Sequence, residues 1–296
     1  MKISVLTPTY NRGQLLGNLY KSLKENANYG MDIEWLIMDD ESTDDTSNRI
    51  KKFQQENKIE IRYFEQKNQG KMVAINQLVE KATGDLIIEC DSDDYFTKDA
   101  FQIIGQAWEE NKDRKDIYGL CFLKYDNKGN NMGKEFQKKE TTMFDLYFKE
   151  GENGEKAIVF FSKIRKQYHY ILERNERFST EARMHHKMDE KYQIITSNKP
   201  IMICEYQEDG YTKNINRQFK ENPYGYYEYF KEILQKDFKG VKFSKRLYVI
   251  KHYILFSYLT KQYHVKGIKG IENKTLYYLL LVPGMIKSKR FSKSKI

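Results

Sequence analysis

The sequence predicts an α/β protein built on a largely parallel sheet, followed by a basic helical extension at the C-terminus. Over the first 110 residues, short apolar runs alternate with amphipathic stretches, which is the pattern of βαβ units. Polar residues gather where each apolar run ends. From Lys239 onward, 14 Lys or Arg stand against one acid, Glu272, so the tail holds about +13 and the rest of the chain about −4 of the net +9.

Four apolar runs have the length and the Ile, Val and aromatic content of strands, namely residues 2–7, 33–39, 59–65 and 85–90. Residues 13–26 and 71–82 repeat apolar side chains at helical spacing. Crossover helices of this kind cover both faces of a sheet whose ligands bind at the carboxyl ends of its strands. Residues 160–178 predict a further amphipathic helix.

The composition is that of a folded protein of a reducing compartment. With 40% hydrophobic and 14% aromatic residues, the 296-residue chain can bury a core. Its cysteines, Cys90, Cys121 and Cys204, are too few and too scattered for a disulfide scaffold, and no C-x-x-C spacing indicates a structural zinc. The N-terminal run lacks the apolar region and cleavage site of a signal peptide, so we expect a cytosolic protein.

Four polar loops follow the four predicted strands and are expected to meet at one rim of the sheet. They read PTYNR (8–12), DDESTDDT (39–46), QKNQGK (66–71) and DSDD (91–94). No G-x-G-x-x-G or Walker A spacing appears, so a bound phosphate would need another neutralising group.

Two of the carboxylates in the DSDD loop suggest such a group. Asp91 and Asp93, one residue apart after a strand, can share a hard divalent cation that bridges phosphate oxygens. The alternative is a plain turn whose Asp side chains accept from nearby backbone amides. For DDESTDDT the alternative is a helix cap made by Ser42 or Thr43. The coincidence of both clusters at one rim favours the cation.

The quoted loops also carry a resemblance to a known family. ISVLTPTYNR, IEWLIMDDESTDDT and NQGKMVAINQLVEKATGDLIIECDSDD, in this order, resemble the N-terminal half of family-2 glycosyltransferases of the GT-A fold over about residues 2–100. The resemblance implies a Rossmann-like GT-A fold that binds a nucleoside diphosphate sugar, usually a UDP-sugar, with Mn or Mg. It also implies transfer of the sugar with inversion.

Several residues receive roles from this resemblance. Arg12 and Lys71 stand where a cation near the nucleotide is expected, although Lys71 could equally be a solvated helix start. Asp209, in a loop that resembles one closing over the diphosphate, would add a metal ligand or belong to a plain β-turn. The others are Pro8 and Tyr10 at the nucleobase pocket, Asp40 accepting from the base, Asp91 at the ribose with Ser92 beside it, and Asp93 on the metal, with Asp91 as a second ligand.

The candidate catalytic base is Glu181. It resembles the acid of an F-x-P-E motif of bacterial family members, with Thr180 in place of the proline. An inverting transfer needs a carboxylate that takes the proton of the acceptor hydroxyl. An acid in the first turn of a helix is also favoured by the helix dipole alone, which is the structural alternative.

The basic tail predicts association with an anionic membrane surface. Its apolar blocks, residues 247–259 and 275–286, are too short to span a bilayer, and Pro283 and Gly284 are expected to break the second. The alternative is a helical pair packed on the main domain with its lysines solvated. Nucleic acid is not an expected partner, because no RNA- or DNA-binding module accompanies the charge.

Together these features predict a metal-dependent inverting glycosyltransferase on the cytoplasmic face of the cell membrane, acting on a lipid-linked glycan or polysaccharide precursor. The predicted divisions are a nucleotide-sugar half (1–110), an acceptor half (111–238) and the extension (239–296). The alternatives are a non-catalytic nucleotide-sugar-binding or membrane scaffold protein and, third, a nucleotidyltransferase. The pattern specifies neither the donor sugar nor the acceptor.

Overall fold

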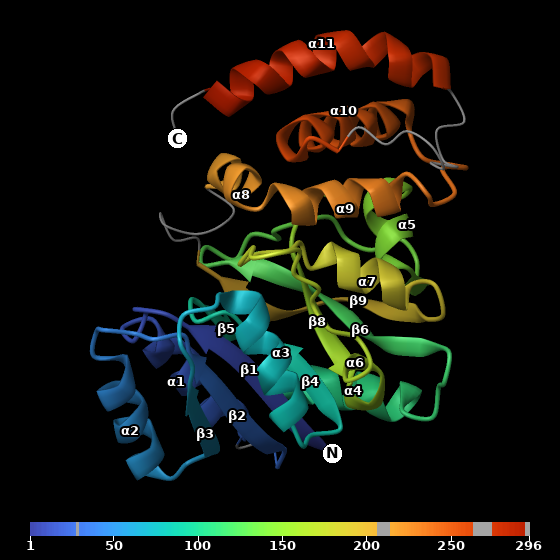
Figure 1. Cartoon of the computed structure of the whole chain (residues 1–296). Coiled ribbons are helices and arrows are strands. Elements are labelled where there is room, and N and C mark those ends of the chain that lie inside the picture. Colours follow the sequence, from blue (N-terminus) through green and yellow to red (C-terminus); the bar gives the residue numbers. More distant parts are fainter. Residues whose placement is uncertain (28–29, 206–213, 263–273, 294–296) are drawn as a thin grey trace. The chain divides into compact units, whose positions relative to one another are not determined.

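The computed structural model describes residues 1–27, 30–205, 214–262 and 274–293, and the chain is organised as two compact units (Figure 1). The first unit comprises Met1–Met143, Glu152–His169 and His186–Gln207. The second comprises Phe144–Gly151, Tyr170–His185 and Glu208–Ile296. These limits differ from the predicted divisions 1–110, 111–238 and 239–296. The roles assigned to those three divisions stay predictions.

The described part of the first unit contains a nine-stranded mixed sheet. Its strands are β1 (Lys2–Thr9), β2 (Asp32–Asp39), β3 (Glu60–Glu65), β4 (Leu86–Glu89), β5 (Asp94–Phe96), β6 (Ile117–Asp126), β7 (Glu140–Thr141), β8 (Lys156–Phe161) and β9 (Gln193–Cys204). The helices of the described chain are α1 (Leu16–Ala27), α2 (Thr46–Glu56), α3 (Lys71–Lys81), α4 (Ala100–Asn111), α5 (Met143–Phe148), α6 (Ser162–Arg165), α7 (Ala182–Met188), α8 (Ile215–Glu221), α9 (Pro223–Ile233), α10 (Phe243–Thr260) and α11 (Lys274–Lys293).

The predicted parallel sheet is confirmed for the first four strands. The order is β3-β2-β1-β4-β8-β6-β9-β5, with β7 paired to β9. Neighbours among β1 to β4 run parallel, whereas β8 is antiparallel to both β4 and β6. The loops that follow β1, β2, β3 and β4 therefore leave the sheet at the same edge.

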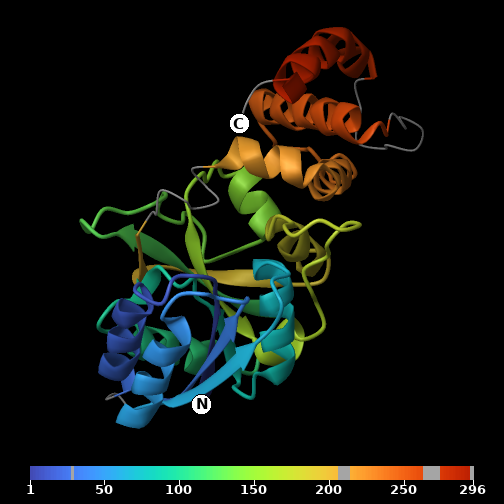
Figure 2. The same cartoon turned by 60° about the vertical axis from the view of Figure 1, so that its left-hand side comes forward.

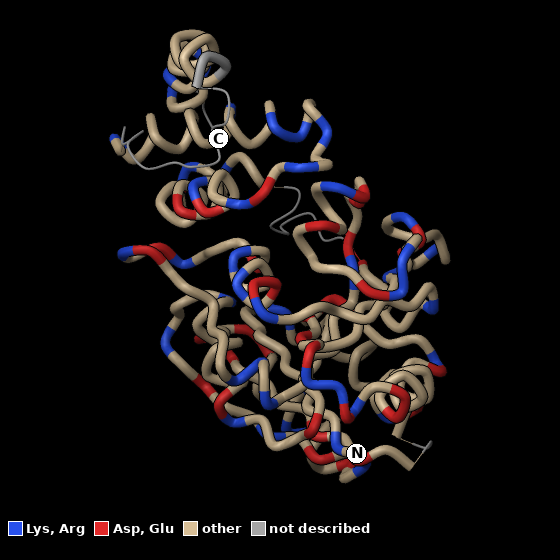
Figure 3. The backbone as a smooth tube through the Cα atoms, turned by 90° about the vertical axis from the view of Figure 1, so that its right-hand side faces the viewer, with Lys and Arg blue, Asp and Glu red and all other residues tan. Residues whose placement is uncertain are grey.

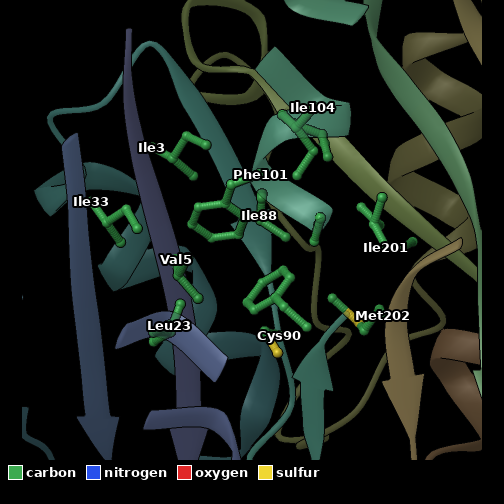
Figure 4. Close-up of a cluster of buried hydrophobic side chains, with 14 of the residues drawn as sticks. Ile3, Val5, Leu23, Ile33, Ile88, Cys90, Phe101, Ile104, Ile201 and Met202 are labelled. Carbon is green, nitrogen blue, oxygen red and sulfur yellow. The ribbon is translucent and has the colours of Figure 1, made fainter. Parts of the chain in front are cut away.

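The core of the first unit shows why these segments become strands and helices. Alternate residues of the strands, such as Ile3, Val5 and Ile88, face one buried cluster with α1 and α4, represented by Leu23 and Phe101 (Figure 4). The opposite face of β1 and β2 is covered by α3, most of whose apolar side chains are buried. Strands β1 and β2 are covered on both faces, so nearly all of their residues are buried.

A buried carboxylate ties the amino ends of the parallel strands together. Glu34 of β2 accepts hydrogen bonds from the Ser4 hydroxyl at 2.5 Å, the Thr83 amide at 2.6 Å and the Arg62 guanidinium at 2.9 Å. The Ser4 oxygen in turn accepts from the Gly84 amide at 2.8 Å. A Cβ at Gly84 would lie 2.7 Å from the Ser4 nitrogen, so only glycine fits against β1 at this position before β4.

The prediction of a helix over residues 160–178 is wrong. Residues 160–178 do not form one helix: β8 ends at Phe161, α6 covers Ser162–Arg165, and no helix follows until α7 within the described chain. The apolar residues at the start of this segment pair with β4 and β6. The guanidinium of Arg165 is buried and donates to Glu89 at 2.8 Å and to the Tyr168 carbonyl, so the segment stays in contact with the end of β4.

The second unit is helical and is held by an aromatic-rich cluster. Helices α9, α10 and α11 lie side by side within it (Figures 1 and 2). The cluster consists of Phe144, Phe148, Tyr226, Tyr227, Phe230, Ile233, Leu234, Phe238, Val241, Val249, Ile250, Tyr253, Ile254, Phe256 and Tyr277. Because Phe238 and Val241 share this cluster with α10, the tail packs on the residues that precede it.

The prediction that Pro283 and Gly284 break the second apolar block is wrong, because α11 runs through both residues. Contact with α10 explains the continuity. A Cβ at Gly284 would lie 2.8 Å from Ile254 Cγ2, so the two helices touch closely at this point. Among the helices of the described residues, none combines the length and the apolarity that crossing a membrane requires.

The Glu34 network predicts a specific pH dependence of stability. Burial acts to raise the pKa of Glu34, but the bonds from Ser4, Thr83 and Arg62 outweigh it and lower the pKa from 4.5 to about 2. A carboxyl whose folded pKa is depressed adds stability above pH 4.5, and this contribution of about 3 kcal/mol is lost as the pH falls toward 2. Glu34→Gln should therefore lower the free energy of unfolding at pH 7. The difference in unfolding free energy between the substituted and the unsubstituted protein should become smaller as the pH falls toward 2.

Urea unfolding followed by tryptophan fluorescence measures this effect, because both Trp35 and Trp108 lie in the first unit. The matched control is Glu60→Gln, since Glu60 pairs with Lys2 at an exposed position and should contribute less than about 1 kcal/mol. Equal effects of the two substitutions at pH 7 would contradict the role of Glu34.

Candidate active site

The loops after β1 and β2 are joined by hydrogen bonds at the carboxyl edge of the sheet. The side-chain oxygen of Asn11 accepts from the backbone amides of Thr43 at 2.7 Å and Asp44 at 3.3 Å. Asp44 in turn accepts from the Gly13 amide at 3.2 Å. Asn11 adopts a left-handed backbone conformation (φ 52°), which asparagine tolerates better than most residues. Tyr10 and Arg12 are the residues directly before and after Asn11.

Asp40 organises the loop between β3 and α3. Its carboxylate is buried and accepts from the Gln66 side chain at 2.7 Å and from the amides of Gln69 and Gly70, both at 2.8 Å. Gly70 has φ 93°, a conformation that favours glycine, and Lys71 begins α3 immediately after it. The carboxylate therefore fixes the start of α3, and its predicted contact with a nucleobase stays a prediction.

Asp91, the first carboxylate after β4, pairs with Lys71. The Lys71 ammonium lies 2.8 Å from the Asp91 carboxylate, and the aspartate side chain is 42% exposed. The surroundings of Asp91 act to raise its pKa by desolvation, but the charge of Lys71 outweighs this and the pKa is lowered. Asp91 is therefore ionised and still partly open to solvent.

Asp93, the second carboxylate, pairs with Arg12 across the rim. Arg12 Nη1 lies 3.1 Å from Asp93 Oδ2, and the aspartate side chain is mostly buried. Burial, followed by the negative charge of Asp91, raises the pKa of Asp93 to about 6 in spite of Arg12. The two carboxylates destabilise one another's charge, which is the situation that a bound divalent cation relieves.

Asp94, the third carboxylate, is neutralised by a residue that sequence reasoning missed. Lys124 of β6 donates to Asp94 at 2.8 Å, and the aspartate side chain is only 3% exposed. Desolvation acts to lower the pKa of Lys124, but Asp94 and Glu155 outweigh it and raise the pKa well above its usual range. The one signal in the sequence was a lysine at the end of the apolar run IYGLCFL.

The other predicted site residues occupy separate places. Pro8 is buried in β1 opposite Met38, Tyr10 is 48% exposed just beyond the strand, and Ser92 is buried between the two aspartates. Asp209 lies outside the described residues. Glu181 belongs to the second unit, where its carbonyl accepts from the amides of Met184 and His185 as α7 begins. It directly precedes that helix rather than standing in its first turn, and its catalytic role stays a prediction.

At the rim, Asp91 and Asp93 are the two residues suited to hold a divalent cation. Within the ranges that the structure describes, no three His, Cys, Asp or Glu side chains are gathered as a metal site. Asp91 and Asp93 are two adjacent carboxylates whose charges repel. Mg²⁺ is commonly held by one or two carboxylates together with phosphate oxygens of a substrate, so this pair suits a cation that arrives with a diphosphate.

Comparison with known families identifies the chain. The family model for glycosyl transferase family 2 matches residues 4–170, more than half of the sequence. The chain belongs to glycosyl transferase family 2. This match confirms the resemblance that the sequence predicted. It also confirms the predicted class of enzyme, because this family consists of glycosyltransferases.

Two curated relatives illustrate how far the similarity extends. A GalNAc(5)-diNAcBac-PP-undecaprenol beta-1,3-glucosyltransferase of Campylobacter jejuni is 30% identical over 189 residues, covering 61% of this chain and 55% of the relative. A glycosyltransferase of Mycoplasma genitalium is 34% identical over 132 residues, covering 42% of this chain and 44% of the relative. This chain therefore spans about half of the length of these relatives.

Two solved structures share the fold. Residues 1–349 of Staphylococcus aureus TarS in complex with UDP-GlcNAc superpose with a TM-score of 0.59 at 17% identity, over 98% of this chain and 83% of that one. The mannosyltransferase PcManGT from Pyrobaculum calidifontis in complex with GDP-Man and Mn²⁺ gives 0.58 at 13% identity, over 98% and 86%. The predicted GT-A fold with a helical C-terminal part is confirmed.

The Lys124–Asp94 pair predicts strong energetic coupling. Lys124→Met leaves a buried carboxylate without its cation and should destabilise the first unit by about 3 to 5 kcal/mol. Adding Asp94→Asn to the same chain should recover most of that loss, because the uncompensated charge is then absent. Urea unfolding followed by tryptophan fluorescence measures both.

The control is Lys128→Met, an exposed lysine on the turn after β6, which should change the free energy of unfolding by less than about 0.5 kcal/mol. Additive effects of the Lys124 and Asp94 substitutions would show that the pair is not coupled.

Proposed function

We propose that this protein transfers a sugar, with inversion and with a divalent metal, from a UDP-sugar to a hydroxyl group of a lipid-linked glycan or polysaccharide precursor. The observation that carries this proposal is the pair Asp91 and Asp93 at the carboxyl edge of β1 to β4, each held beside a cation. An edge of this kind is where open α/β sheets bind nucleotides.

The donor side is supported by the rim and by the neighbours. Arg12 and Lys71 reach the two carboxylates from the loops after β1 and β3. On donor binding they would donate to phosphate oxygens in place of carboxylate oxygens, which keeps their charge compensated. The TarS and PcManGT structures hold UDP-GlcNAc and GDP-Man respectively, and we extend a nucleoside diphosphate sugar to this chain on the basis of the shared family.

Asp91 and Asp93 would hold the divalent metal, Mn or Mg. When bound, such a cation stabilises the negative charge that develops on the departing diphosphate. The protein's own part is to keep Asp91 ionised through Lys71 and to hold Asp93 beside it through Arg12. Support for the metal comes from the mutual repulsion of these carboxylates and from the Mn²⁺ present in the PcManGT structure.

Glu181 would act as the general base on the acceptor side. A carboxylate that takes the acceptor proton makes the hydroxyl oxygen nucleophilic as it attacks the donor sugar. Glu181 is partly buried and directly precedes α7, at the place that corresponds to the acid of the F-x-P-E motif.

The acceptor class rests on the relatives. The Campylobacter relative is named for an undecaprenol-linked glycan, and TarS for poly(ribitol-phosphate). Both acceptors are polymers or lipid-linked chains that present hydroxyl groups. We infer an acceptor of the same class here and place the reaction at the cytoplasmic face of the membrane.

The metal role predicts the behaviour of Asp93→Asn. This substitution keeps the shape of the side chain and removes a ligand charge, so the fold should persist while turnover of a UDP-sugar with Mn²⁺ falls by roughly 10²- to 10³-fold. Asp113→Asn, at an exposed position after α4, is the matched control and should leave the rate unchanged. Full activity of the unsubstituted protein in excess chelator would remove the metal from the mechanism.

The base role predicts a separate kinetic signature for Glu181→Gln. The kcat for transfer should fall by roughly 10²- to 10⁴-fold while UDP affinity stays close to normal, because the base acts on the acceptor. Glu190→Gln, an exposed acid beyond the same helix, controls for a general effect of losing a carboxylate. An unchanged kcat would exclude Glu181 as the base.

A further inference from the structure

Helix α11 has apolar side chains on two opposite sides, and one of these sides is covered. Tyr277 is 2% exposed and its ring lies 6.3 Å from that of Tyr253 on α10. Gly284 meets Ile254, and Ser288, one turn further, is also buried. These three residues recur at helical spacing and form the inner side of the helix, which packs on α10.

The outer side of α11 is apolar and exposed. Tyr278, Leu279, Val282 and Ile286 are 58%, 68%, 64% and 53% exposed. At 3.6 residues per turn they fall within an arc of about 100°, roughly opposite the inner side. In the described part of the chain these are four of the nine large apolar side chains that are exposed. An apolar side of a helix normally packs against another surface, and among the described residues nothing buries this one.

Two cations, Lys287 and Arg290, lie along one edge of this outer side toward the C-terminal end of the helix. An open hollow of about 680 Å³ is formed by Pro283, Ile286, Lys287, Arg290 and Phe291. Its surface is almost entirely apolar, and Lys287 and Arg290 contribute to its lining. Apolar surface next to cationic side chains favours the headgroup region of an anionic bilayer.

The charge of the helical pair selects among the occupants that could cover this surface. Neither α10 nor α11 contains an acidic residue (Figure 3). In the sequence, residues 239–296 carry 14 Lys or Arg against one acid. A second copy of the chain would bring a like charge of about +13 against this tail. An anionic lipid surface attracts that charge and also takes up the apolar stripe.

We propose that the outer side of α11 is a membrane-docking surface that lies in the headgroup region of an anionic bilayer. Leu279, Val282 and Ile286 insert between acyl chains, while Lys287 and Arg290 contact lipid phosphates. Proximity to the bilayer would bring the enzyme to a lipid-linked acceptor. The docking surface itself needs neither the metal nor Glu181, so it is tested without catalysis.

The first experiment labels the surface selectively. Cys90, Cys121 and Cys204 are all buried, so a cysteine introduced by Leu279→Cys can carry an environment-sensitive fluorophore on the full chain. Ile215→Cys on α8, in the same unit and 41% exposed, is the matched control. Each labelled protein is mixed with vesicles of phosphatidylcholine alone or of phosphatidylcholine with phosphatidylglycerol.

The expected result is a blue shift of the label at position 279 on the phosphatidylglycerol vesicles only, with no shift at position 215. The shift should weaken as salt is raised, because the attraction is partly electrostatic. Absence of a shift at position 279 at low salt would overturn the proposal. So would a shift that appears without vesicles as protein concentration rises, since the surface would then join two copies of the chain.

A second experiment measures vesicle binding of the unlabelled protein. Leu279→Glu combined with Val282→Glu should reduce sedimentation with the anionic vesicles by roughly tenfold or more, while UDP-sugar hydrolysis stays unchanged. Ile215→Glu should alter neither. Truncation is unsuitable, because Phe238 and Val241 share one buried cluster with α10. Unchanged sedimentation of the doubly substituted, folded protein would contradict docking through this side of α11.

Discussion

Three carboxylates lie within four residues after β4, and each is compensated by a cation from a different part of the chain. Lys71 at the start of α3 pairs with Asp91, Arg12 after β1 with Asp93, and Lys124 of β6 with Asp94. Without these cations the end of β4 would concentrate negative charge in a partly buried site, which is strongly unfavourable. The three pairs therefore connect the loop after β4 to the loop after β1, to the start of α3 and to β6.

The pairs differ in a way that bears on function. Asp94 and Lys124 are both largely buried, so this pair is part of the framework. Asp91 remains partly exposed, and Asp93 has a raised pKa because its neighbour carries the same charge. These two carboxylates are the ones that a metal–diphosphate would stabilise further. The Asp94–Lys124 pair thus fixes the loop that carries Asp91 and Asp93, the two carboxylates proposed to hold the metal.

Much of this arrangement could be predicted from the sequence, and the exceptions have physical causes. The four parallel strands and the carboxylates at their ends follow from local patterns, and these patterns were sufficient to place Arg12, Lys71, Asp91 and Asp93 at one rim. Lys124 could not be predicted, because its partner is 30 residues away and meets it only through the sheet. Residues 160–178 kept a helical period, yet β8 and the buried Arg165–Glu89 pair determine their structure. At Pro283 the packing of α11 on α10 outweighed a local helix-breaking signal.

Metal and nucleotide binding are expected to depend on one another, because Lys71 and Arg12 already compensate the carboxylates that would receive the metal. The most direct test is the binding of Mn²⁺ to the full chain, followed by the loss of the electron paramagnetic resonance signal of the aqueous ion, with and without UDP. We expect weak binding of Mn²⁺ alone and binding of one ion at least roughly tenfold tighter when UDP is present. Equal Mn²⁺ affinity with and without UDP, or no binding in either case, would contradict the account.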